Sequence, residues 1–317
     1  MNVFEISRGF RAVARSGLLA PTRPDRLLRA GLATRHWGPT LAAAFAAGAA
    51  RFGDRVGLFD DRGALTYEEL EARTNALARG LSAVGVKPGD VVGILCRNHR
   101  YFVDATGACS KLGAHALYLN TSFSTPQLRD VVQREDVRAL VIDAEFRSLV
   151  DEQFHGAVVT AWNDDELASG TTVELLISQH DSTPPPRPEV TGRTIVLTSG
   201  TTGTPKGASR AHTTAAGPAI AMLDRIPYRV KETMVIAAPM FHSWGLGNFT
   251  IGLVMGDTLV CTRRFDPEAT LATIERYRAH VLAAVPVMLQ RILDLPPEVC
   301  RRYDVSSLRL VPLSGSA

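Results

Sequence analysis

Residues 198–208 hold the side chains whose types and spacing are best suited to chemistry in this sequence, in the order Thr-Ser-Gly-Thr-Thr-Gly-Thr-Pro-Lys-Gly-Ala. Glycines let backbone N–H groups turn toward one point, hydroxyl groups add short hydrogen-bond donors, and Lys206 supplies a mobile positive charge. The chain has only four lysines among its 35 basic residues, so a lysine in this loop stands out. The pattern predicts a cradle for a polyphosphate.

Two other interpretations explain this segment less well. A flexible Ser/Thr/Gly linker seldom follows a β-branched run such as Thr194–Leu197, and it seldom ends in Pro-Lys-Gly. A Walker-type phosphate loop needs glycine before its lysine and a hydroxyl residue after it, where this chain has Pro205 and Gly207. An ordinary P-loop ATPase or kinase is therefore not expected.

The elements that must position this loop follow an alternating pattern from residue 90 onward. Short apolar runs alternate with helical stretches, which predicts βαβ units, a parallel sheet and right-handed crossovers. The expected strands are 91–95, 116–119, 139–142, 158–161, 194–197, 234–238, 258–262, 281–285 and 308–313, and the expected helices include 101–112, 125–135 with Thr125 as its N-cap, and one opened by Asp266-Pro267-Glu268. The phosphate loop then lies at the carboxyl end of a strand, where ligands bind in open α/β sheets.

The predicted fold class is α/β, with two stacked βαβ-type layers that are incomplete at the C-terminus. Four prolines within residues 181–190 exclude helix there and indicate a connector. The expected organisation is a basic leader at 1–40, a first α/β subdomain at 41–180, this connector, and a second subdomain with the phosphate loop at 191–317.

Composition excludes several classes of function. A net charge of +3 without a basic run among aromatic residues argues against a nucleic-acid partner. The four cysteines are scattered, with no C-x-x-C, and we expect none of them to pair with a histidine at the spacing of metal ligands. This pattern argues against a zinc site or a disulfide framework, and it fits a cytoplasmic location. The first 36 residues carry seven arginines and two acids, which predicts either a surface helix, a transit-like leader or a basic amphipathic segment in peripheral contact with an anionic membrane.

Two further segments could contribute to a site. Residues 239–247 read Pro-Met-Phe-His-Ser-Trp-Gly-Leu-Gly after a predicted strand, and a lone histidine such as His242 is by itself more often structural than catalytic. Residues 310–317 read Leu-Val-Pro-Leu-Ser-Gly-Ser-Ala, a strand that ends in a turn of small residues. Taken alone, neither segment identifies a site.

The phosphate loop resembles the [Ser/Thr]-Ser-Gly-Thr-Thr-Gly-x-Pro-Lys-Gly signature of the adenylate-forming superfamily, which includes acyl-CoA synthetases, luciferases and peptide-synthetase adenylation domains. The segments at 239–247 and 310–317 resemble the second and third core motifs of the same superfamily. Scaffold segments at 65–70 and 85–92 continue the likeness, which covers about residues 40 to 317. The resemblance is strongest to the N-terminal portion of a long-chain fatty-acid–CoA ligase.

That resemblance implies a two-step reaction. A carboxylate attacks the α-phosphate of Mg·ATP to give an acyl-adenylate and pyrophosphate, and coenzyme A then takes the acyl group. It implies phosphate binding by Thr198, Ser199, Gly200, Thr201, Thr202, Gly203 and Lys206, adenine binding by Ser314, Gly315, Ser316 and Ala317, and contact with the acyl substrate by His242, Trp244 and Gly245. His242 is expected to orient the substrate or stabilise charge, and Trp244 to gate an acyl tunnel. The apolar run formed by Trp244, Leu246, Phe249, Ile251 and Leu253 favours a fatty acid as the carboxylate.

The sequence departs from the superfamily by its length. The element with the Mg²⁺-binding glutamate and the small C-terminal domain are expected beyond residue 317, so no metal ligand is assigned within these residues. The chain alone is therefore expected not to turn over. Two alternatives are a catalytically inactive remnant that acts by binding a ligand or a partner, and an acyl-AMP ligase that loads a carrier protein.

Overall fold

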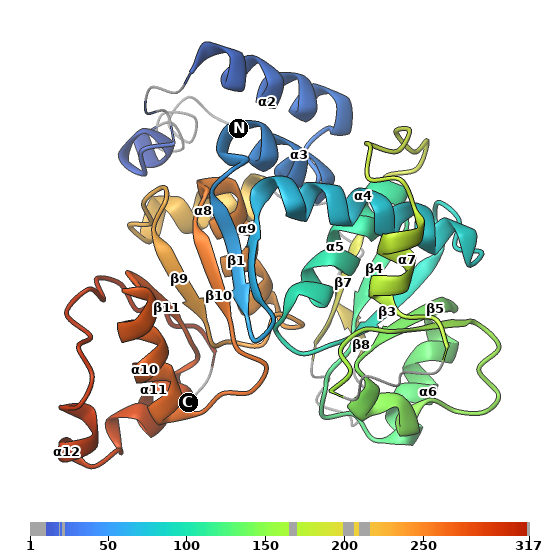
Figure 1. Cartoon of the computed structure of the whole chain (residues 1–317). Helices are drawn as coiled ribbons and strands as arrows, with labels where there is room; N and C mark the ends of the chain where they lie inside the picture. The colour runs from blue at the N-terminus through green and yellow to red at the C-terminus, as the bar shows by residue number, and fades with distance from the viewer. Residues whose placement is uncertain are drawn as a thin grey trace. The chain divides into compact units, whose positions relative to one another are not determined.

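A computed structural model describes residues 11–18, 20, 23–164, 170–198, 206–208 and 216–315 (Figure 1). The chain forms two compact units, each built on its own sheet. Unit 1 contains the described residues up to Pro39, then Ala43–Glu68, and those from 216 onward. Unit 2 contains Thr40–Ala42 and the described residues from Glu69 to 208.

Unit 2 holds a six-stranded sheet in the order β6-β5-β3-β4-β7-β8. Its strands are β3 (Val91–Leu95), β4 (His115–Tyr118), β5 (Val137–Ile142), β6 (Ala157–Thr160), β7 (Thr194–Thr198) and β8 (Lys206–Ala208). All neighbours are parallel except β7 and β8, which form an antiparallel pair. The predicted strand β7 therefore joins this sheet, because Leu117 of β4 pairs with Ile195.

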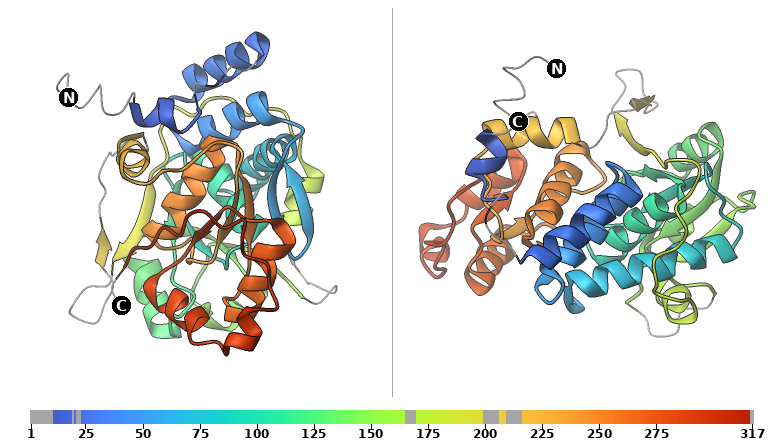
Figure 2. Two further views of the ribbon diagram at one scale, coloured as in Figure 1. Left: turned by 90° about the vertical axis from the view of Figure 1, so that its left-hand side faces the viewer. Right: turned by 90° about the horizontal axis from the view of Figure 1, so that it is seen from above.

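Helices cover both faces of the unit 2 sheet. They are α4 (Tyr67–Ala83), α5 (Arg100–Leu112), α6 (Thr125–Arg134) and α7 (Val173–Gln179), with a 3-10 turn η1 (Ala144–Leu149). Figures 1 and 2 show α4, α5 and α7 on one side and α6 on the other, as right-handed crossovers require. The N-cap of α6 is Ser124, one residue before the predicted Thr125, because Ser124 forms a capping box with Gln127.

Unit 1 holds a five-stranded sheet in the order β11-β9-β10-β1-β2. Its strands are β1 (Val56–Asp60), β2 (Gly63–Thr66), β9 (Thr233–Ile236), β10 (Thr258–Cys261) and β11 (Val281–Ala283). Strand β1 pairs in parallel with β10, about two hundred residues later, and in antiparallel with β2. Its helices are α2 (Pro24–Trp37), α3 (Leu41–Phe52, except its first two residues), α8 (Ala216–Arg225), α9 (Ser243–Met255), α10 (Pro267–Tyr277), α11 (Pro286–Leu293) and α12 (Pro297–Cys300).

The α/β class and the parallel sheets are confirmed, and three further details differ from the predictions. The units are not divided at the Pro-rich connector: residues 43–68 fold with the C-terminal part of the chain through the β1–β10 pairing. The connector instead runs along unit 2, where Asn75 and Arg79 of α4 donate hydrogen bonds to the carbonyl oxygens of Ser182 and Thr183. The predicted strand 308–313 makes only isolated parallel bridges to the β11 region, at Leu310 and Leu313.

Candidate active site

The second motif follows the carboxyl end of β9, which lies between β11 and β10 in the unit 1 sheet. The N–H groups of Ala237 and Ala238 both donate to the carbonyl oxygen of Ala283, at 3.0 Å. The chain then turns, with the N–H of His242 donating to the carbonyl oxygen of Pro239 at 3.1 Å, and enters α9. The motif is therefore held at the strand end by backbone hydrogen bonds.

His242 is the N-cap residue of α9 and is exposed. Its backbone carbonyl accepts from Leu246, whereas its side chain makes no capping hydrogen bond. The imidazole lies against Phe241, with 4.4 Å between ring centroids. Part of the ring is shielded from water, and this desolvation lowers the pKa of His242 below its usual value. His242 is thus neutral near pH 7 and can offer one hydrogen-bond donor and one acceptor.

Trp244 is half-buried and fixed in place. Its indole Nε1 donates to the carbonyl oxygen of Ala284 at 2.9 Å, and its own carbonyl accepts from the side-chain amide of Asn248. The hydroxyl of Tyr228 donates to the other end of that amide at 2.6 Å. In this conformation Trp244, the predicted gate residue, is fixed by its hydrogen bond to Ala284, directly after β11.

Gly245 is required by a close approach of backbone to backbone. A Cβ atom at this position would lie 2.2 Å from the carbonyl oxygen of Pro239 and 2.8 Å from that of Ala238. A Cβ at Gly247 would meet only the sulfur of Met222, at 3.4 Å. Gly245 therefore lets α9 begin directly against the end of β9, and Gly247 does not have that role.

The third motif reaches the same strand end through Ala284. The N–H of Leu282 donates to the carbonyl of Leu310 at 3.0 Å, and the N–H of Ala284 lies 3.4 Å from the carbonyl oxygen of Pro312. Ala284 thus contacts the third motif through its N–H and Trp244 of the second motif through its carbonyl. Two of the three predicted motifs meet at one residue.

Some predicted site residues lie outside the described residues. Ser314 and Gly315 are exposed, and Gly315 has a φ of +109°, which favours glycine; Ser316 and Ala317 are not described. Of the phosphate loop, Thr198 and Lys206 are paired across the β7–β8 hairpin, whereas Ser199, Gly200, Thr201, Thr202 and Gly203 are not described. The hairpin places both ends of the loop at the carboxyl end of β7.

The apolar residues of α9 that were predicted to favour a fatty acid belong to the core of unit 1. Leu246, Phe249, Ile251 and Leu253 are all buried, and Phe249 lies 6.3 Å from Phe45 of α3, centroid to centroid. A helix that is apolar on all sides is one that is buried within its domain. This run therefore stabilises the core of unit 1 and does not support a choice of acyl substrate.

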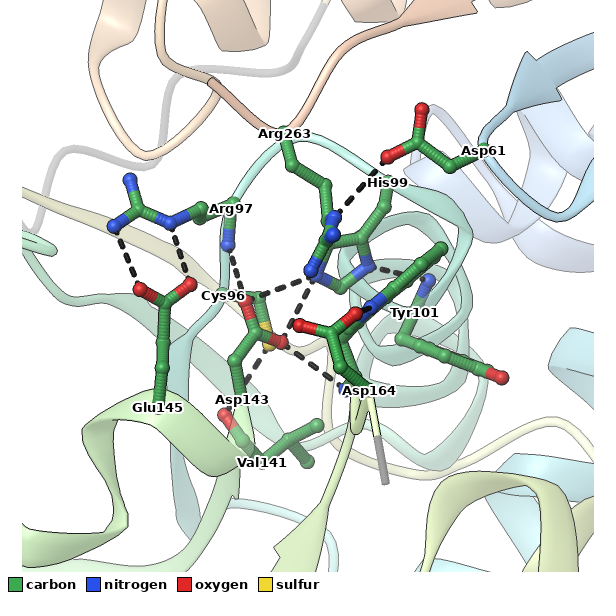
Figure 3. Close-up of polar contacts among 11 residues, drawn as sticks. Asp61, Cys96, Arg97, His99, Tyr101, Val141, Asp143, Glu145, Asp164 and Arg263 are labelled. Atoms are coloured by element: carbon green, nitrogen blue, oxygen red, sulfur yellow. Dashed lines mark hydrogen bonds and ion pairs between the residues drawn. The ribbon is translucent and has the colours of Figure 1, made fainter. Parts of the chain in front are cut away.

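A buried cluster in unit 2 was missed from the sequence. Cys96, His99 and Asp143 place one ligand atom each within 4.8 Å of one another, at the carboxyl ends of β3 and β5 (Figure 3). The interpretation that no cysteine has a histidine at metal spacing was wrong, since Cys96 and His99 form a C-x-x-H pair. That pair was the available signal, whereas Asp143 is 44 residues further along the chain.

The hydrogen bonds of this cluster identify it as a structural clamp. The N–H of Tyr101 donates to His99 Nδ1 at 3.2 Å, so Nε2 carries the proton and donates to Asp143 at 2.9 Å. Asp143 also accepts from the N–H groups of Arg97 and Trp162. A metal would need the lone pair of Nε2 and a proton on Nδ1, which this arrangement excludes. The cluster instead joins β3, the start of α5 and the end of β5.

One cavity of about 430 Å³ lies within unit 2. Its lining includes Asp90, Val137, Gly156, and Leu128 and Val132 of α6. These residues lie at or near the amino ends of β3, β5 and β6, the opposite edge from the phosphate loop. The cavity is therefore separate from the predicted nucleotide site.

Comparisons with known proteins agree with the motifs. The profile of the AMP-binding enzyme family matches residues 45–317. A feruloyl-CoA synthase of Amycolatopsis sp. is 32% identical over 259 residues, which are 80% of this chain and 50% of that protein. The chain thus spans about half the length of this curated relative.

Solved structures show the same fold. The anthranilate CoA ligase AuaEII, in complex with anthranoyl-AMP, superposes with a TM-score of 0.77 at 20% identity, over 88% of this chain and 55% of that one. A putative long-chain-fatty-acid CoA ligase from Rhodopseudomonas palustris superposes with a TM-score of 0.74 at 26% identity, over 87% of this chain and 70% of that one. Within the described residues, no helix is long and apolar enough to cross a membrane.

Proposed function

The chain belongs to the AMP-binding enzyme family, and on that premise we propose that the protein to which these residues belong activates a carboxylic acid with ATP and transfers the acyl group to coenzyme A. The observation that carries the proposal is the junction at Ala284, where the second and third motifs meet at the end of β11. The β7–β8 hairpin supports it by framing the phosphate-loop sequence at the carboxyl end of a parallel strand.

The first step forms a bond from a carboxylate oxygen to the α-phosphorus of ATP and breaks the bond to the β,γ-pyrophosphate. Catalysis of such a transfer depends on positioning and charge stabilisation. We assign the β- and γ-phosphates to the hydroxyl and N–H groups of residues 198–203, with Lys206 balancing their negative charge. The adenine is assigned to the backbone of residues 314–317.

His242 is assigned to orient the carboxylate. Its lowered pKa keeps the imidazole neutral, so it can donate one hydrogen bond to a carboxylate oxygen without holding that oxygen as a tight ion pair. The position of the residue at the start of α9, exposed and without a capping bond, leaves the ring available to a ligand. Mg²⁺ enters with ATP, and none of the described site residues is a carboxylate that could hold it.

In the second step the thiol of coenzyme A attacks the acyl carbonyl carbon, and AMP leaves. We assign no residue of this chain to that step. A direct test of both steps is product analysis with the whole protein: the proposal expects AMP, pyrophosphate and acyl-CoA in equal amounts, and only when a carboxylic acid is added. Formation of ADP and phosphate would contradict it.

For the acyl group we propose a fatty acid, on the support of the likeness to the putative long-chain ligase of Rhodopseudomonas palustris. The names of the feruloyl-CoA synthase and the anthranilate CoA ligase give the competing class, aromatic acids. A panel of saturated fatty acids, ferulate and anthranilate, compared by kcat/KM for pyrophosphate release, separates the two. A higher kcat/KM for an aromatic acid than for every fatty acid would overturn this narrower proposal and leave the reaction itself intact.

A further inference from the structure

Helix α2 of unit 1 exposes an unusual concentration of leucines. Nine large apolar side chains are exposed in the described part of the chain, and three of them, Leu27, Leu28 and Leu32, belong to this 14-residue helix. Leu28 is 66% exposed and Leu32 is 57% exposed. Single exposed leucines are ordinary, whereas neighbouring ones on a short helix indicate a contact surface.

The spacing of these residues separates two faces of α2. Leu28, Leu32 and Arg35 recur at four and three residues, so they lie on one side of the helix. Ala30 and Trp37, seven residues apart, lie on the opposite side and are buried. The helix therefore has an inner apolar face that packs on unit 1 and an outer apolar face that does not.

The orientation of α2 is fixed from its inner side. Arg26 donates to the carbonyl oxygen of Arg51 at 3.2 Å and lies 3.6 Å from the carboxylate of Asp54, beside the end of α3. Figures 1 and 2 show α2 along the margin of unit 1, beside α3. The outer leucines are thus presented by a helix whose rotation about its axis is set by contacts within its own unit.

The charge around the outer face is positive. Residues 23–36 contain four arginines and one acid, Asp25, which is paired with Arg23 at 3.1 Å and Arg29 at 2.7 Å. The last turn of α2 adds Arg35 and His36. A leucine-bearing face flanked by arginines has the chemistry of a helix that lies in the interface of an anionic bilayer, where leucines enter the acyl boundary and arginines meet lipid phosphates.

We propose that the outer face of α2, formed by Leu28, Leu32 and Arg35 and flanked by Leu27 and Arg29, binds an anionic lipid surface. This binding does not depend on the proposed reaction. It brings unit 1 to the membrane by apolar insertion and by charge, without a membrane-spanning segment. Because the leucines are already exposed, their replacement leaves the core of the unit unchanged.

The test is co-sedimentation of the 317-residue chain with vesicles of equimolar phosphatidylglycerol and phosphatidylcholine. The proposal expects binding that weakens as salt rises and that is absent with phosphatidylcholine alone. Leu28→Ser/Leu32→Ser should reduce the affinity at least about ten-fold, since each leucine loses the burial of several methylene groups. The matched control is Val287→Ser/Leu293→Ser in α11, where the side chains are 49% and 68% exposed. It should bind like the unmodified chain.

A charge variant tests the second half of the proposal. Arg29→Gln/Arg35→Gln should weaken binding to anionic vesicles and flatten its salt dependence, whereas Arg301→Gln/Arg302→Gln, at exposed positions elsewhere in unit 1, should not. No binding to anionic vesicles, or an equal loss in the α11 control, would overturn the proposal. A third outcome would also overturn it: light scattering shows a dimer, Leu28→Ser/Leu32→Ser dissociates that dimer, and no lipid binding is seen. A second copy of the chain would then cover this face.

Discussion

Two histidines occupy equivalent local positions in the two units and have opposite surroundings. His99 and His242 each follow a parallel strand, β3 or β9, and each is the N-cap residue of the next helix. His99 is fully buried, and both its ring nitrogens are hydrogen-bonded within the protein. His242 is exposed, and its side chain makes no capping bond. The end of a parallel strand can thus hold a histidine that is hydrogen-bonded within the protein or one whose ring is exposed, and only the second kind is open to a ligand.

The largest expected effect is on stability, at the buried histidine. His99→Ala removes the side-chain donor to Asp143 and leaves this buried carboxylate with fewer hydrogen bonds, among them those from the N–H groups of Arg97 and Trp162. Leaving a buried group short of a hydrogen-bond partner costs up to about 3 kcal/mol of unfolding free energy, and more when that group is charged, as this carboxylate is. His242→Ala should change that free energy by less than about 0.5 kcal/mol, as is usual for exposed positions. Urea unfolding followed by circular dichroism measures both, and equal losses would break the comparison.

Gly245 and Gly247 test whether the start of α9 requires the close backbone approach to Pro239. Gly245→Ala places a Cβ against the carbonyl oxygen of Pro239, and relieving that overlap should cost about 1–3 kcal/mol and shift the start of α9. Gly247→Ala meets only a flexible methionine side chain and replaces a glycine in a helix, so it should be neutral or stabilising by up to about 1 kcal/mol. Thermal unfolding of the two variants distinguishes these outcomes; similar losses would show that the approach to Pro239 is not what requires glycine.

A smaller effect is expected at Trp244. Trp244→Phe retains most of the packing and removes the hydrogen bond to the carbonyl of Ala284, at a cost of about 1 kcal/mol. Because Ala284 also contacts the third motif, the whole protein should show a higher KM for ATP with little change in the KM for the acid. Steady-state kinetics of pyrophosphate release measures both constants, and a change confined to the acid would instead favour the gate that the sequence predicts.

The smallest expected effect is a titration. Desolvation lowers the pKa of His242, so the folded protein favours the neutral ring. The contribution of this group to the unfolding free energy is therefore lost as pH falls, first through the histidine pKa of the unfolded chain and then through the lowered pKa of the folded protein. The activity should fall over the same acidic range, since the protonated ring no longer offers the arrangement assigned above. NMR of the imidazole protons, assigned with His242→Gln, should give a pKa below 6.5, and a value above it would contradict the account.

Local signals in the sequence predicted the elements that depend on local interactions. Asp266 caps α10 as expected, because its side chain accepts from the N–H of Ala269 three residues later. Most strands of the two sheets were recognisable as short apolar runs, and the exceptions are β1, β2 and β8. Strand β1 is specified by pairing with Leu259 and Val260, which no local pattern records.

The site was predictable to the extent that a motif is contiguous. His242, Trp244 and Gly245 could be proposed because they stand in one segment, and the structure adds that Ala284 joins Trp244 to the third motif. The cluster of His99 and Asp143 depends on two strands that are adjacent only in the folded sheet, so its pairing could not be read from spacing. The apolar residues of α9 were predicted to contact an acyl chain, whereas they are buried in the core. A buried helix and the lining of an apolar pocket have the same composition, so the sequence could not distinguish them.

The measurement that tests the central claim most directly is exchange of radiolabelled pyrophosphate into ATP by the whole protein, with and without a carboxylic acid. The account predicts exchange only when the acid is present, and a loss of at least about ten-fold in His242→Ala, with unfolding free energy unchanged. Exchange without acid, no exchange with any acid of the panel, or full exchange in His242→Ala would contradict it.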